Sequence, residues 1–258
     1  MLKQRMPSLF IGHGSPMNLM LENDFTKALD ILGKELPLPK AILVISAHWY
    51  AHQTAVSMAS GIGYETLYDF YGFPPSLYEI RYESPSNNTL SKRIAALLDA
   101  SLIERGLDHG AWMPLHFLFP KASVPVIQLS IDRHLSFDAY VAMGKKLAIL
   151  REEGIMLLGS GNITHNLGLI DFYNIDATPA SWAKNVDAFI ENAFTHNDIK
   201  SLVDIEAKSP DFKTAHPSFD HYAPLLYIAG TRIREDNLRI ITPLFQHANL
   251  SMKGFMLS

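Results

Sequence analysis

The residues best suited to chemistry in this sequence are three histidines, each of which follows an apolar or glycine-rich run. His13 comes after the apolar run 8–11, His48 ends the apolar run that begins at Ala41, and His165 follows a glycine-rich stretch. In open α/β sheets, ligands bind beyond the carboxyl ends of the strands. A single histidine at such a place is usually a hydrogen-bonded structural residue. Three at equivalent places predict one shared cleft.

A second concentration of polar residues lies late in the chain, where His216, Asp220 and His221 fall within six residues. They precede an apolar stretch that predicts a helix over 222–229, ended by Gly230 in the position after the last helical residue. Two interpretations stay open. Either Asp220 caps this helix and the histidines are turn residues, or one of the histidines closes the cleft from the helix start.

The available ligand types narrow the metal chemistry. The chain has no cysteine, so thiolate sites and disulfides are excluded and His, Asp and Glu remain as ligands. A cluster of imidazoles with carboxylates nearby suits Fe(II), Zn(II) or a similar borderline cation.

Composition indicates one folded domain over residues 1–258. Hydrophobic residues make up 48% of the chain and charged residues 19%, and 22 basic against 26 acidic residues give a net charge of −4. The basic residues are scattered, so nucleic acid is not an expected partner. No apolar run approaches the roughly 20 residues that span a bilayer, and Pro7 and Gly12 interrupt the N-terminal segment too early for a signal peptide. We therefore expect a cytoplasmic protein without membrane contact.

The elements that must position the histidines follow from the apolar patterning. Short apolar runs predict buried strands that alternate with amphipathic helices, which is typical of an α/β fold. Strands are expected at 8–11, 41–49, 53–59, 124–131 and 155–158, with apolar end pieces at 238–241 and 252–256. Helices are expected from near Asn23 or Asp24 to residue 32 (ended by Gly33), over 180–194 and 198–207, and after the caps Asn87 and Ser136. The helix after Asn87 has an apolar face that reaches Leu102. We predict a single domain with a mostly parallel or mixed central sheet and helices on both faces.

Two segments resist assignment to regular elements. Residues 61–82 gather seven aromatic side chains around glycines and prolines, which indicates either a loop folded over a pocket or a local hydrophobic cluster. Residues 106–116 are expected to form a loop rich in polar and aromatic tips.

Other kinds of site fit the sequence less well. Ser15 lacks the Gly-x-Ser-x-Gly spacing of a nucleophile elbow, and Pro16 would break the helix that such a turn feeds. Residues 159–162 match neither a complete dinucleotide fingerprint nor a P-loop. Four further histidines lie in polar or terminal contexts and are expected at the surface: His52, His134, His196 and His247.

Taken together, the motifs resemble the 4,5-DOPA dioxygenase extradiol family, within the class III extradiol ring-cleaving dioxygenase superfamily. The likeness runs over nearly the whole chain. It is carried by Gly12-His13-Gly14-Ser15-Pro16, Ser46-Ala47-His48-Trp49, Tyr71-Gly72-Phe73-Pro74, Leu107-Asp108-His109-Gly110-Ala111-Trp112, Gly159-Ser160-Gly161-Asn162, Thr164-His165-Asn166, His216-Pro217 and Asp220-His221.

The resemblance implies a metal site made by His13, His48 and His221. It also implies that His165 is the acid/base residue at the metal, with a possible role as fourth ligand. The protocatechuate branch of the superfamily resembles iron sites with two histidines and one carboxylate, whereas this chain offers a third imidazole. Three neutral imidazoles suit Zn(II) as well as Fe(II).

The implied reaction is the opening of a catechol ring by O2 to a muconic semialdehyde, with Fe(II) as the metal. His109 and His216 are expected to hydrogen-bond the substrate oxygens or to orient ligands, and Tyr71, Phe73 and Trp112 to form apolar walls against the ring. Two other classes stay open: a zinc hydrolase, and a metal-containing protein of the same fold that is not an oxygenase. The sequence leaves the oligomeric state open.

Overall fold

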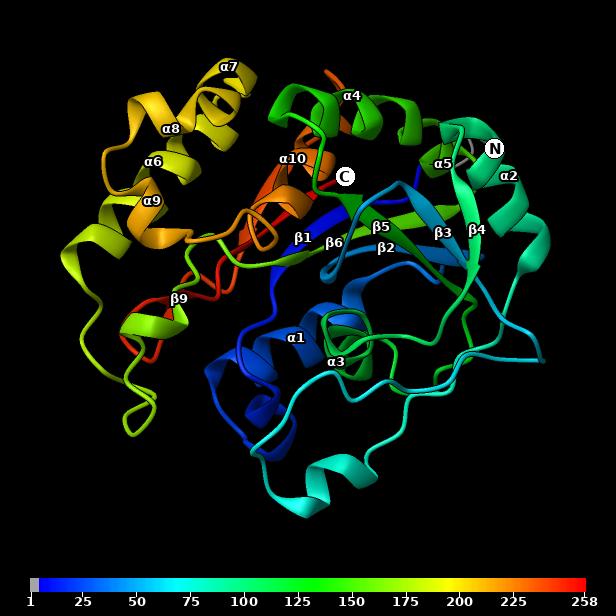
Figure 1. The fold of residues 1–258 in the computed structure, drawn as a ribbon, viewed down its shortest axis with the longest axis horizontal. Coiled ribbons are helices and arrows are strands. Elements are labelled where there is room, and N and C mark those ends of the chain that lie inside the picture. Colours follow the sequence, from blue (N-terminus) through cyan, green and yellow to red (C-terminus); the bar gives the residue numbers. More distant parts are fainter. Residues whose placement is uncertain (1–4) are drawn as a thin grey trace.

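The computed structural model describes residues 5–258, and its framework is one eight-stranded sheet (Figure 1). The strand order is β4-β3-β5-β2-β6-β1-β10-β7. The strands are β1 (Ser8–Gly12), β2 (Ala41–Ala51), β3 (Ala55–Met58), β4 (Ser101–Glu104), β5 (Val126–Asp132), β6 (Ile155–Gly161), β7 (Leu238–Ile241) and β10 (Gly254–Leu257), and a separate small sheet pairs β8 (Phe245–Gln246) with β9 (Leu250–Ser251).

The centre of the sheet is parallel, and each flank joins it through an antiparallel pair, while β4 pairs in parallel with β3 at one edge. Strands β5, β2, β6 and β1 run in one direction, with β2 paired in parallel to both β5 and β6. On one flank β10 pairs antiparallel with β1 and β7, and on the other β3 pairs antiparallel with β5. The predicted mixed α/β sheet is therefore confirmed.

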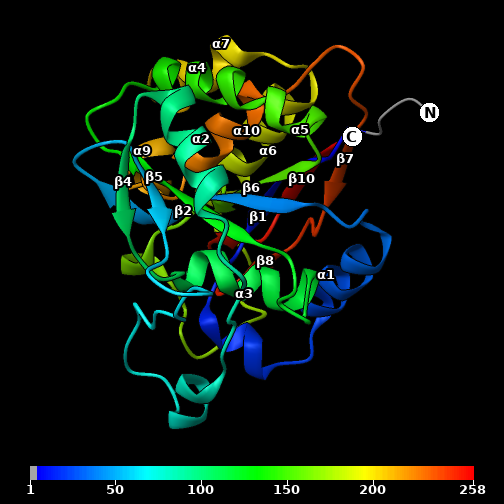
Figure 2. The same ribbon diagram turned by 90° about the vertical axis from the view of Figure 1, so that its right-hand side faces the viewer.

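Helices cover both faces of the sheet, as predicted (Figure 2). Successive side chains of a strand point to opposite faces, so Leu43 and Ile45 of β2 enter one core while Ile42 and Val44 enter the other. The first core is covered by α2 (Asn88–Leu98), α4 (Phe137–Leu147), α6 (Ser181–Thr195) and α10 (Ala223–Gly230), and the second by α1 (Asp24–Glu35) and α3 (His109–Leu118). The remaining helices are short: α5 (Ile149–Glu152), α7 (Ile199–Val203), α8 (Ile205–Lys208) and α9 (Phe212–Ala215).

Helix α10 is buried along its whole length and begins and ends differently from the prediction. Gly230 is its last residue rather than the residue after its end. A Cβ at Gly230 would lie 2.2 Å from the carbonyl oxygen of Val141, so glycine is needed here for the close contact with α4. Asp220 does not cap the helix, because Tyr222 occupies the N-cap position without a side-chain hydrogen bond.

Two more helix ends differ from the prediction for identifiable reasons. Helix α1 continues through Gly33 to Glu35, since Gly33 is the point where α1 crosses α3 and a Cβ would lie 2.6 Å from the oxygen of Leu118. Helix α2 ends at Leu98 because Asp99 adopts a left-handed conformation (φ 55°), so Leu102 belongs to β4 and not to the helix face. The helix expected over 198–207 is split into α7 and α8.

The predicted loop at 106–116 is wrong, since α3 begins at His109. Asp108 caps it by accepting a hydrogen bond from the backbone N–H of Ala111. Gly110 and Pro114 were the misleading residues. A Cβ at Gly110 would lie 2.4 Å from Oγ of Ser46, so this glycine permits close packing instead of marking a loop.

Within the described part of the chain, no helix is both long and apolar enough to cross a bilayer.

Candidate metal centre

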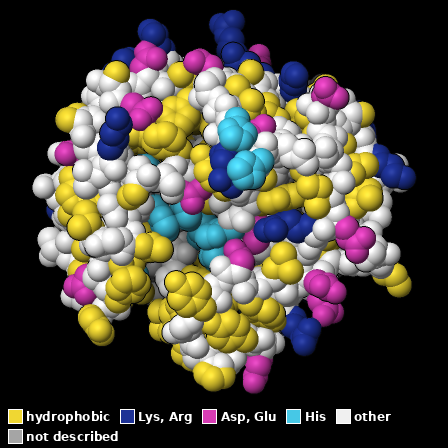
Figure 3. Space-filling model, viewed as in Figure 1, with side chains coloured by type: hydrophobic (Ala, Val, Ile, Leu, Met, Phe, Trp, Pro, Cys, Tyr) yellow, Lys and Arg dark blue, Asp and Glu magenta, His cyan; other side chains and the backbone are white. Residues whose placement is uncertain are grey.

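Three histidines from distant parts of the chain meet at one edge of the sheet. One ring nitrogen from each of His13, His48 and His221 lies within 4.8 Å of the others. The ring centroids are 5.0 Å apart for His13 and His48, 5.2 Å for His13 and His221, and 5.1 Å for His48 and His221. Figure 3 shows histidine side chains on the floor of a hollow that hydrophobic and acidic side chains border.

Two of these histidines come from strands. His13 directly follows β1, as predicted. His48 was expected at the tip of its strand, but β2 continues to Ala51. Its pairing with β5 shifts register between Ile45 and Tyr50. Such irregularities re-aim side chains next to functional sites, and this one contains His48.

The third histidine is held by the glycine-rich end of β6. The backbone N–H of Asn162 donates to the carbonyl oxygen of His221 at 3.0 Å. A Cβ at Gly161 would lie 2.2 Å from that same oxygen. The glycine at the end of β6 therefore lets the segment before α10 approach the sheet.

Ser160 fixes the orientation of His13. Its Oγ lies 3.0 Å from Nδ1 of His13, and Nε2 of the same ring lies 3.0 Å from Nε2 of His48. A hydroxyl that accepts the hydrogen of Nδ1 leaves the lone pair of Nε2 free for ligation. The two Nε2 atoms thus point to a common centre.

His221 has the clearest mark of a ligand. Its side chain is 4% exposed, and although Nδ1 lies 3.2 Å from Oδ2 of Asp220, neither ring nitrogen meets hydrogen-bond geometry with any described residue. Buried polar atoms in folded proteins nearly always have a partner. Three converging imidazoles, one of them without hydrogen bonds, fit a borderline divalent cation such as Fe(II) or Zn(II).

The surroundings of His13 and His48 favour the neutral form of both rings. Burial lowers the pKa of His13 well below its usual range, and the neighbouring His221, His109 and His165 lower it further. Burial and then His109 and His13 do the same to the pKa of His48. Imidazoles must be neutral to bind a metal, so these two rings are ready to ligate at neutral pH.

His165 lies against the centre without belonging to the group of three. Its ring stacks on that of His221 with centroids 3.5 Å apart and an interplanar angle of 5°. Its backbone N–H donates to the oxygen of Ala215. Burial and then His221 lower its pKa well below the usual value, against an opposing effect of Asp220. His165 is therefore a neutral base at the side of the centre.

His216 lies outside the group of three histidines, at the turn after β6. Its Nε2 lies 2.8 Å from the carbonyl oxygen of Ile163, and its ring neighbours are Phe212 and Tyr222. Burial lowers its pKa to about 4. It supports the turn that leads from β6 to His165.

His109 lies beside His48 and brings a carboxylate that the sequence did not single out. The two rings have centroids 3.8 Å apart. The backbone N–H of His109 donates to Oδ1 of Asp69 at 2.9 Å, and Nδ1 of its ring lies 3.0 Å from the same oxygen. Burial raises the pKa of Asp69, but the contacts with His109 outweigh this and lower it overall. Asp69 lies in the aromatic stretch, where no spacing pattern marks it.

The aromatic stretch forms a packed cluster, and only part of it faces the histidines. Phe70 meets the ring of His109 edge-on at 5.3 Å. Tyr71 is 93% exposed, and Trp112 is fully buried with its Nε1 donating to the oxygen of Leu67. Three residues were predicted to form apolar walls against the substrate ring. Tyr71 is exposed to solvent, Trp112 packs under the loop through its contact with Leu67, and Phe73 is half-buried against Phe70.

The remaining candidates lie elsewhere. Oγ of Ser15 accepts a hydrogen bond from the N–H of Met17 and caps the 3₁₀ helix Pro16–Met20. His52, His134 and His196 are exposed as predicted, whereas His247 is half-buried with Nδ1 2.9 Å from the oxygen of Asp171.

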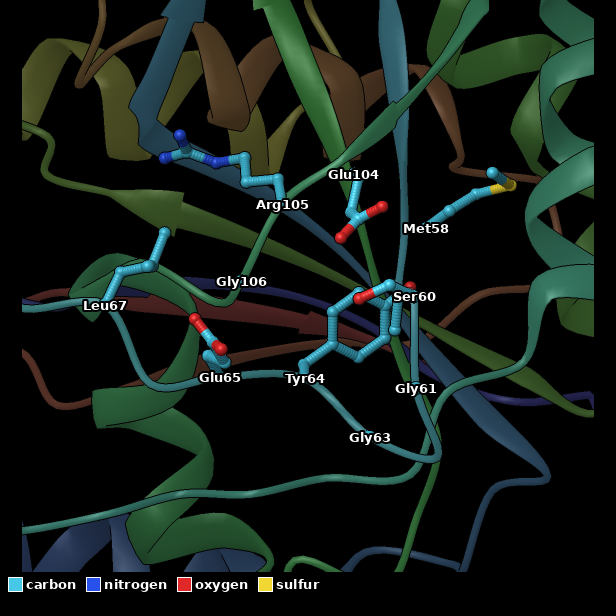
Figure 4. Close-up of a pocket in the computed structure, with 11 residues that line it drawn as sticks. Met58, Ser60, Gly61, Gly63, Tyr64, Glu65, Leu67, Glu104, Arg105 and Gly106 are labelled. Carbon is cyan, nitrogen blue, oxygen red and sulfur yellow. The ribbon is translucent and has the colours of Figure 1, made fainter.

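Two surface cavities also lie apart from the centre. One of about 420 Å³ is lined by residues 58–61, 63–65, 67 and 104–106 (Figure 4). Another of about 440 Å³ is lined by residues 21–25, 175–176 and 244–246. No histidine lines either cavity.

The fold and these residues define a mixed α/β protein with a candidate metal centre made of histidines. Residues 10–256 match the family described as the catalytic LigB subunit of aromatic ring-opening dioxygenase. The chain is 36% identical over 263 residues to "4,5-DOPA dioxygenase extradiol" of Escherichia coli (strain K12), covering 98% of this chain and 94% of that protein. It is 37% identical over 242 residues to the protein of the same name from Beta vulgaris, covering 86% and 85%.

A solved structure agrees with these relatives. The crystal structure of an uncharacterized Escherichia coli K12 protein, 34% identical, superposes with a TM-score of 0.83 and covers 98% of this chain and 100% of that one. The chain belongs to the family of catalytic LigB subunits of aromatic ring-opening dioxygenases. Its relatives indicate an extradiol dioxygenase, which is an oxidoreductase that uses a divalent metal.

Proposed function

We propose that this protein opens the ring of a catechol similar to 4,5-DOPA, using O2, at one divalent metal held by His13, His48 and His221. The product is a muconic semialdehyde that contains both atoms of O2. The observation that carries this proposal is the convergence of three ring nitrogens within 4.8 Å with a fourth imidazole, His165, stacked beside them. The names of the relatives from Escherichia coli and Beta vulgaris support the choice of substrate class.

A bound Fe(II) ion would supply the positive charge that acidifies the catechol hydroxyls and the route by which the substrate passes electrons to O2. Zn(II) fits the same three imidazoles, but it has no redox chemistry. Fe(II) is therefore the metal that we assign to the oxygenase reaction.

His165 moves the protons. Since burial keeps its ring neutral, a ring nitrogen can accept a hydrogen from a catechol hydroxyl and return it when the O–O bond breaks. General acid/base groups contribute about 10²–10⁴ in rate. Its stacking on His221, outside the group of three, favours this role over that of a fourth ligand.

His109 and His216 act around the substrate in different ways. His109 is nearly buried beside His48 and Phe70, where it can hydrogen-bond a substrate oxygen. His216 orients the centre through Ile163.

We infer that residues 1–258 form a single catalytic domain, and the position of all three histidines at one edge of one sheet supports this. We infer a small aromatic diol and O2 as partners, with no nucleic acid or membrane. A cytoplasmic location stays a prediction.

Two variants test the assignment of roles. His48→Ala removes a ligand, so the protein should lose bound metal and ring opening together. His165→Ala should keep one metal per chain and still bind catechol without air, but lose ring opening by about 10²-fold or more. Metal analysis, anaerobic catechol titration and oxygen uptake give the three readouts. Equal metal loss in both variants would make His165 a ligand, and unchanged turnover in His165→Ala would remove it from the mechanism.

The wild-type protein distinguishes the oxygenase from a zinc enzyme. Purified without air and loaded with Fe(II), it should consume O2 with a catechol from a panel that includes 4,5-DOPA. Absence of uptake with every catechol, together with ester or amide hydrolysis by the Zn(II) form, would replace this proposal with a zinc hydrolase.

A further inference from the structure

The carboxylate of Asp69 touches two histidines of the centre at once. Its Oδ2 lies 3.4 Å from Nδ1 of His48, and its Oδ1 lies 3.0 Å from Nδ1 of His109 while accepting the backbone N–H of that residue at 2.9 Å. Nδ1 of His109 is buried and meets full hydrogen-bond geometry with no described residue, and the carboxylate of Asp69 is the acceptor that lies 3.0 Å from it. The carboxylate of Asp69 therefore faces Nδ1 of both His48 and His109.

Just before Asp69, the loop is fastened to the residues that lead into α3 and to α3 itself. Thr66 forms a parallel bridge with Leu107, and the N–H of Leu67 donates to the oxygen of Leu107 at 2.8 Å. Beneath it, Nε1 of Trp112 donates to the oxygen of Leu67 at 3.0 Å. These contacts hold the backbone near Asp69 next to α3.

The three proposed ligands share one arrangement. Nδ1 faces Ser160 in His13, Asp220 in His221 and Asp69 in His48. An acceptor at Nδ1 fixes the tautomer whose Nε2 lone pair is free to bind a metal. Asp69 differs from the other two acceptors because it also contacts His109, which lies outside the group of three ligands.

We propose that Asp69 is a positioning residue that fixes the Nδ1–H tautomer of both His48 and His109, and so couples the metal ligand to the residue beside the substrate. This inference rests on the proposed function for the role of His109. Its effect on His48 requires only that the three histidines bind a metal. Partners of this kind contribute about 10–100-fold to metal affinity.

The test uses Asp69→Asn and Asp69→Ala, with Glu65→Gln as the matched control. Glu65 is exposed on the same loop and lines the 420 Å³ cavity (Figure 4), away from the histidines. Zn(II) affinity is measured by competition with a chromophoric chelator, and the tautomers of His48 and His109 by long-range proton–nitrogen NMR. The unfolding temperature of each metal-free variant reports whether the fold is kept.

We expect Zn(II) to bind about 10–100-fold more weakly to both Asp69 variants, with the tautomer signal of His109 shifted and the metal-free unfolding temperature preserved. Glu65→Gln should match the wild type. Affinity within about twofold of wild type in both Asp69 variants would overturn the proposal.

Two further outcomes would overturn the proposal, and the first needs only the wild-type protein, so it decides the matter even if a variant fails to fold. An Nε2–H tautomer of His48 in the zinc-bound protein would overturn it. So would two Zn(II) per chain with one lost in Asp69→Asn, since Asp69 would then be a ligand. Tight Zn(II) binding with the expected tautomers, but no ring opening by the Fe(II) form, would contradict the proposed function. It would not contradict the role of Asp69 at His48.

Discussion

Two buried polar groups, Arg151 and His221, differ sharply in how well the protein satisfies them. The guanidinium of Arg151 is fully buried. Its five N–H groups donate to the carbonyl oxygens of Met6, Thr231 and Leu257 and to both carboxylate oxygens of Asp236, at 2.6 to 3.1 Å. His221 is buried almost as deeply, yet neither of its ring nitrogens makes a hydrogen bond to a described residue.

This difference separates structural from functional burial. A buried donor without a partner costs about 1–3 kcal/mol of folding stability. A protein that keeps such a group therefore uses it in its function or pairs it with a bound ligand. Arg151 ties the N-terminal segment, the end of α10 and β10 together. The ring of His221 makes no such hydrogen bond to a described residue, although Asp220 lies 3.2 Å from its Nδ1, and a bound metal would give its other nitrogen a partner.

The largest effect is expected when Arg151 loses its carboxylate partner and becomes, like His221, a buried polar group that is not fully hydrogen-bonded. Asp236→Ala removes its carboxylate partner and leaves a buried charge without a counter-ion, which costs about 3–5 kcal/mol. Urea unfolding should report a loss of this size, while Zn(II) binding at low urea stays at the wild-type level.

Glu35→Ala is the matched control. Glu35 pairs with Arg239 at the surface, where both side chains are about half exposed. Exposed pairs contribute about 0–1 kcal/mol, so this variant should unfold close to the wild type. A similar loss of stability in both variants would contradict the distinction between the two kinds of burial.

His216 is the intermediate case, because Nε2 has a partner in Ile163 while Nδ1 has none among the described residues. Its folded-state pKa of about 4 lies below the unfolded value near 6.5. The unfolded chain therefore takes up a proton first as the pH falls. Stability present above pH 6.5 is lost on acidification, by about 3 kcal/mol at pH 4.

Urea unfolding of the metal-free protein at pH 7 and pH 4 measures this effect. The wild type should lose about 3 kcal/mol more than His216→Gln, in which the amide keeps a donor for Ile163. Substitution of the exposed His196 by Gln serves as the control and should behave as the wild type. Equal losses in the wild type and His216→Gln would show that His216 is not buried in its neutral form.

The parts of this architecture that follow from local patterning could be predicted. Apolar runs with β-branched residues identify β1, β2, β5 and β6, and a histidine after β1 must lie at the carboxyl edge of the sheet. That rule predicts that His13 and His48 lie close together, although His48 reaches the centre from within β2, at a shift of register that the sequence does not show. The position of His221 came from the family resemblance, since its approach depends on the missing Cβ of Gly161.

The rest depends on contacts that no local pattern encodes. Helix α3 was missed because Gly110 and Pro114 are usual loop signals, although Gly110 is there to admit Ser46. Asp69 was missed because the bridge between Thr66 and Leu107 places it, and a single bridge between distant segments leaves no periodicity. Both errors concern residues whose role is set by tertiary packing.

The smallest expected effect sharpens the comparison within one loop, where Phe70 and Tyr71 are adjacent but differ in burial. Phe70 meets the ring of His109 edge-on, whereas Tyr71 is 93% exposed. Burial of an aromatic side chain against a ligand contributes about 1–2 kcal/mol. Phe70→Ala should therefore raise KM for the catechol by about tenfold with a smaller change in kcat, and Tyr71→Ala should leave both within about twofold.

Steady-state oxygen uptake with the Fe(II)-loaded variants measures both constants, and metal analysis confirms equal loading. The outcome discriminates between two functions of the aromatic stretch. If the aromatic stretch lines the substrate site only through residues that contact the histidines, only Phe70→Ala should raise KM. If the stretch closes over the bound ring as a lid, Tyr71 must leave solvent to reach the substrate, and Tyr71→Ala would then raise KM as much as Phe70→Ala. Because an exposed ring that moves onto a ligand gains burial only in the complex, this second result would appear in KM without any change in the stability of the free protein.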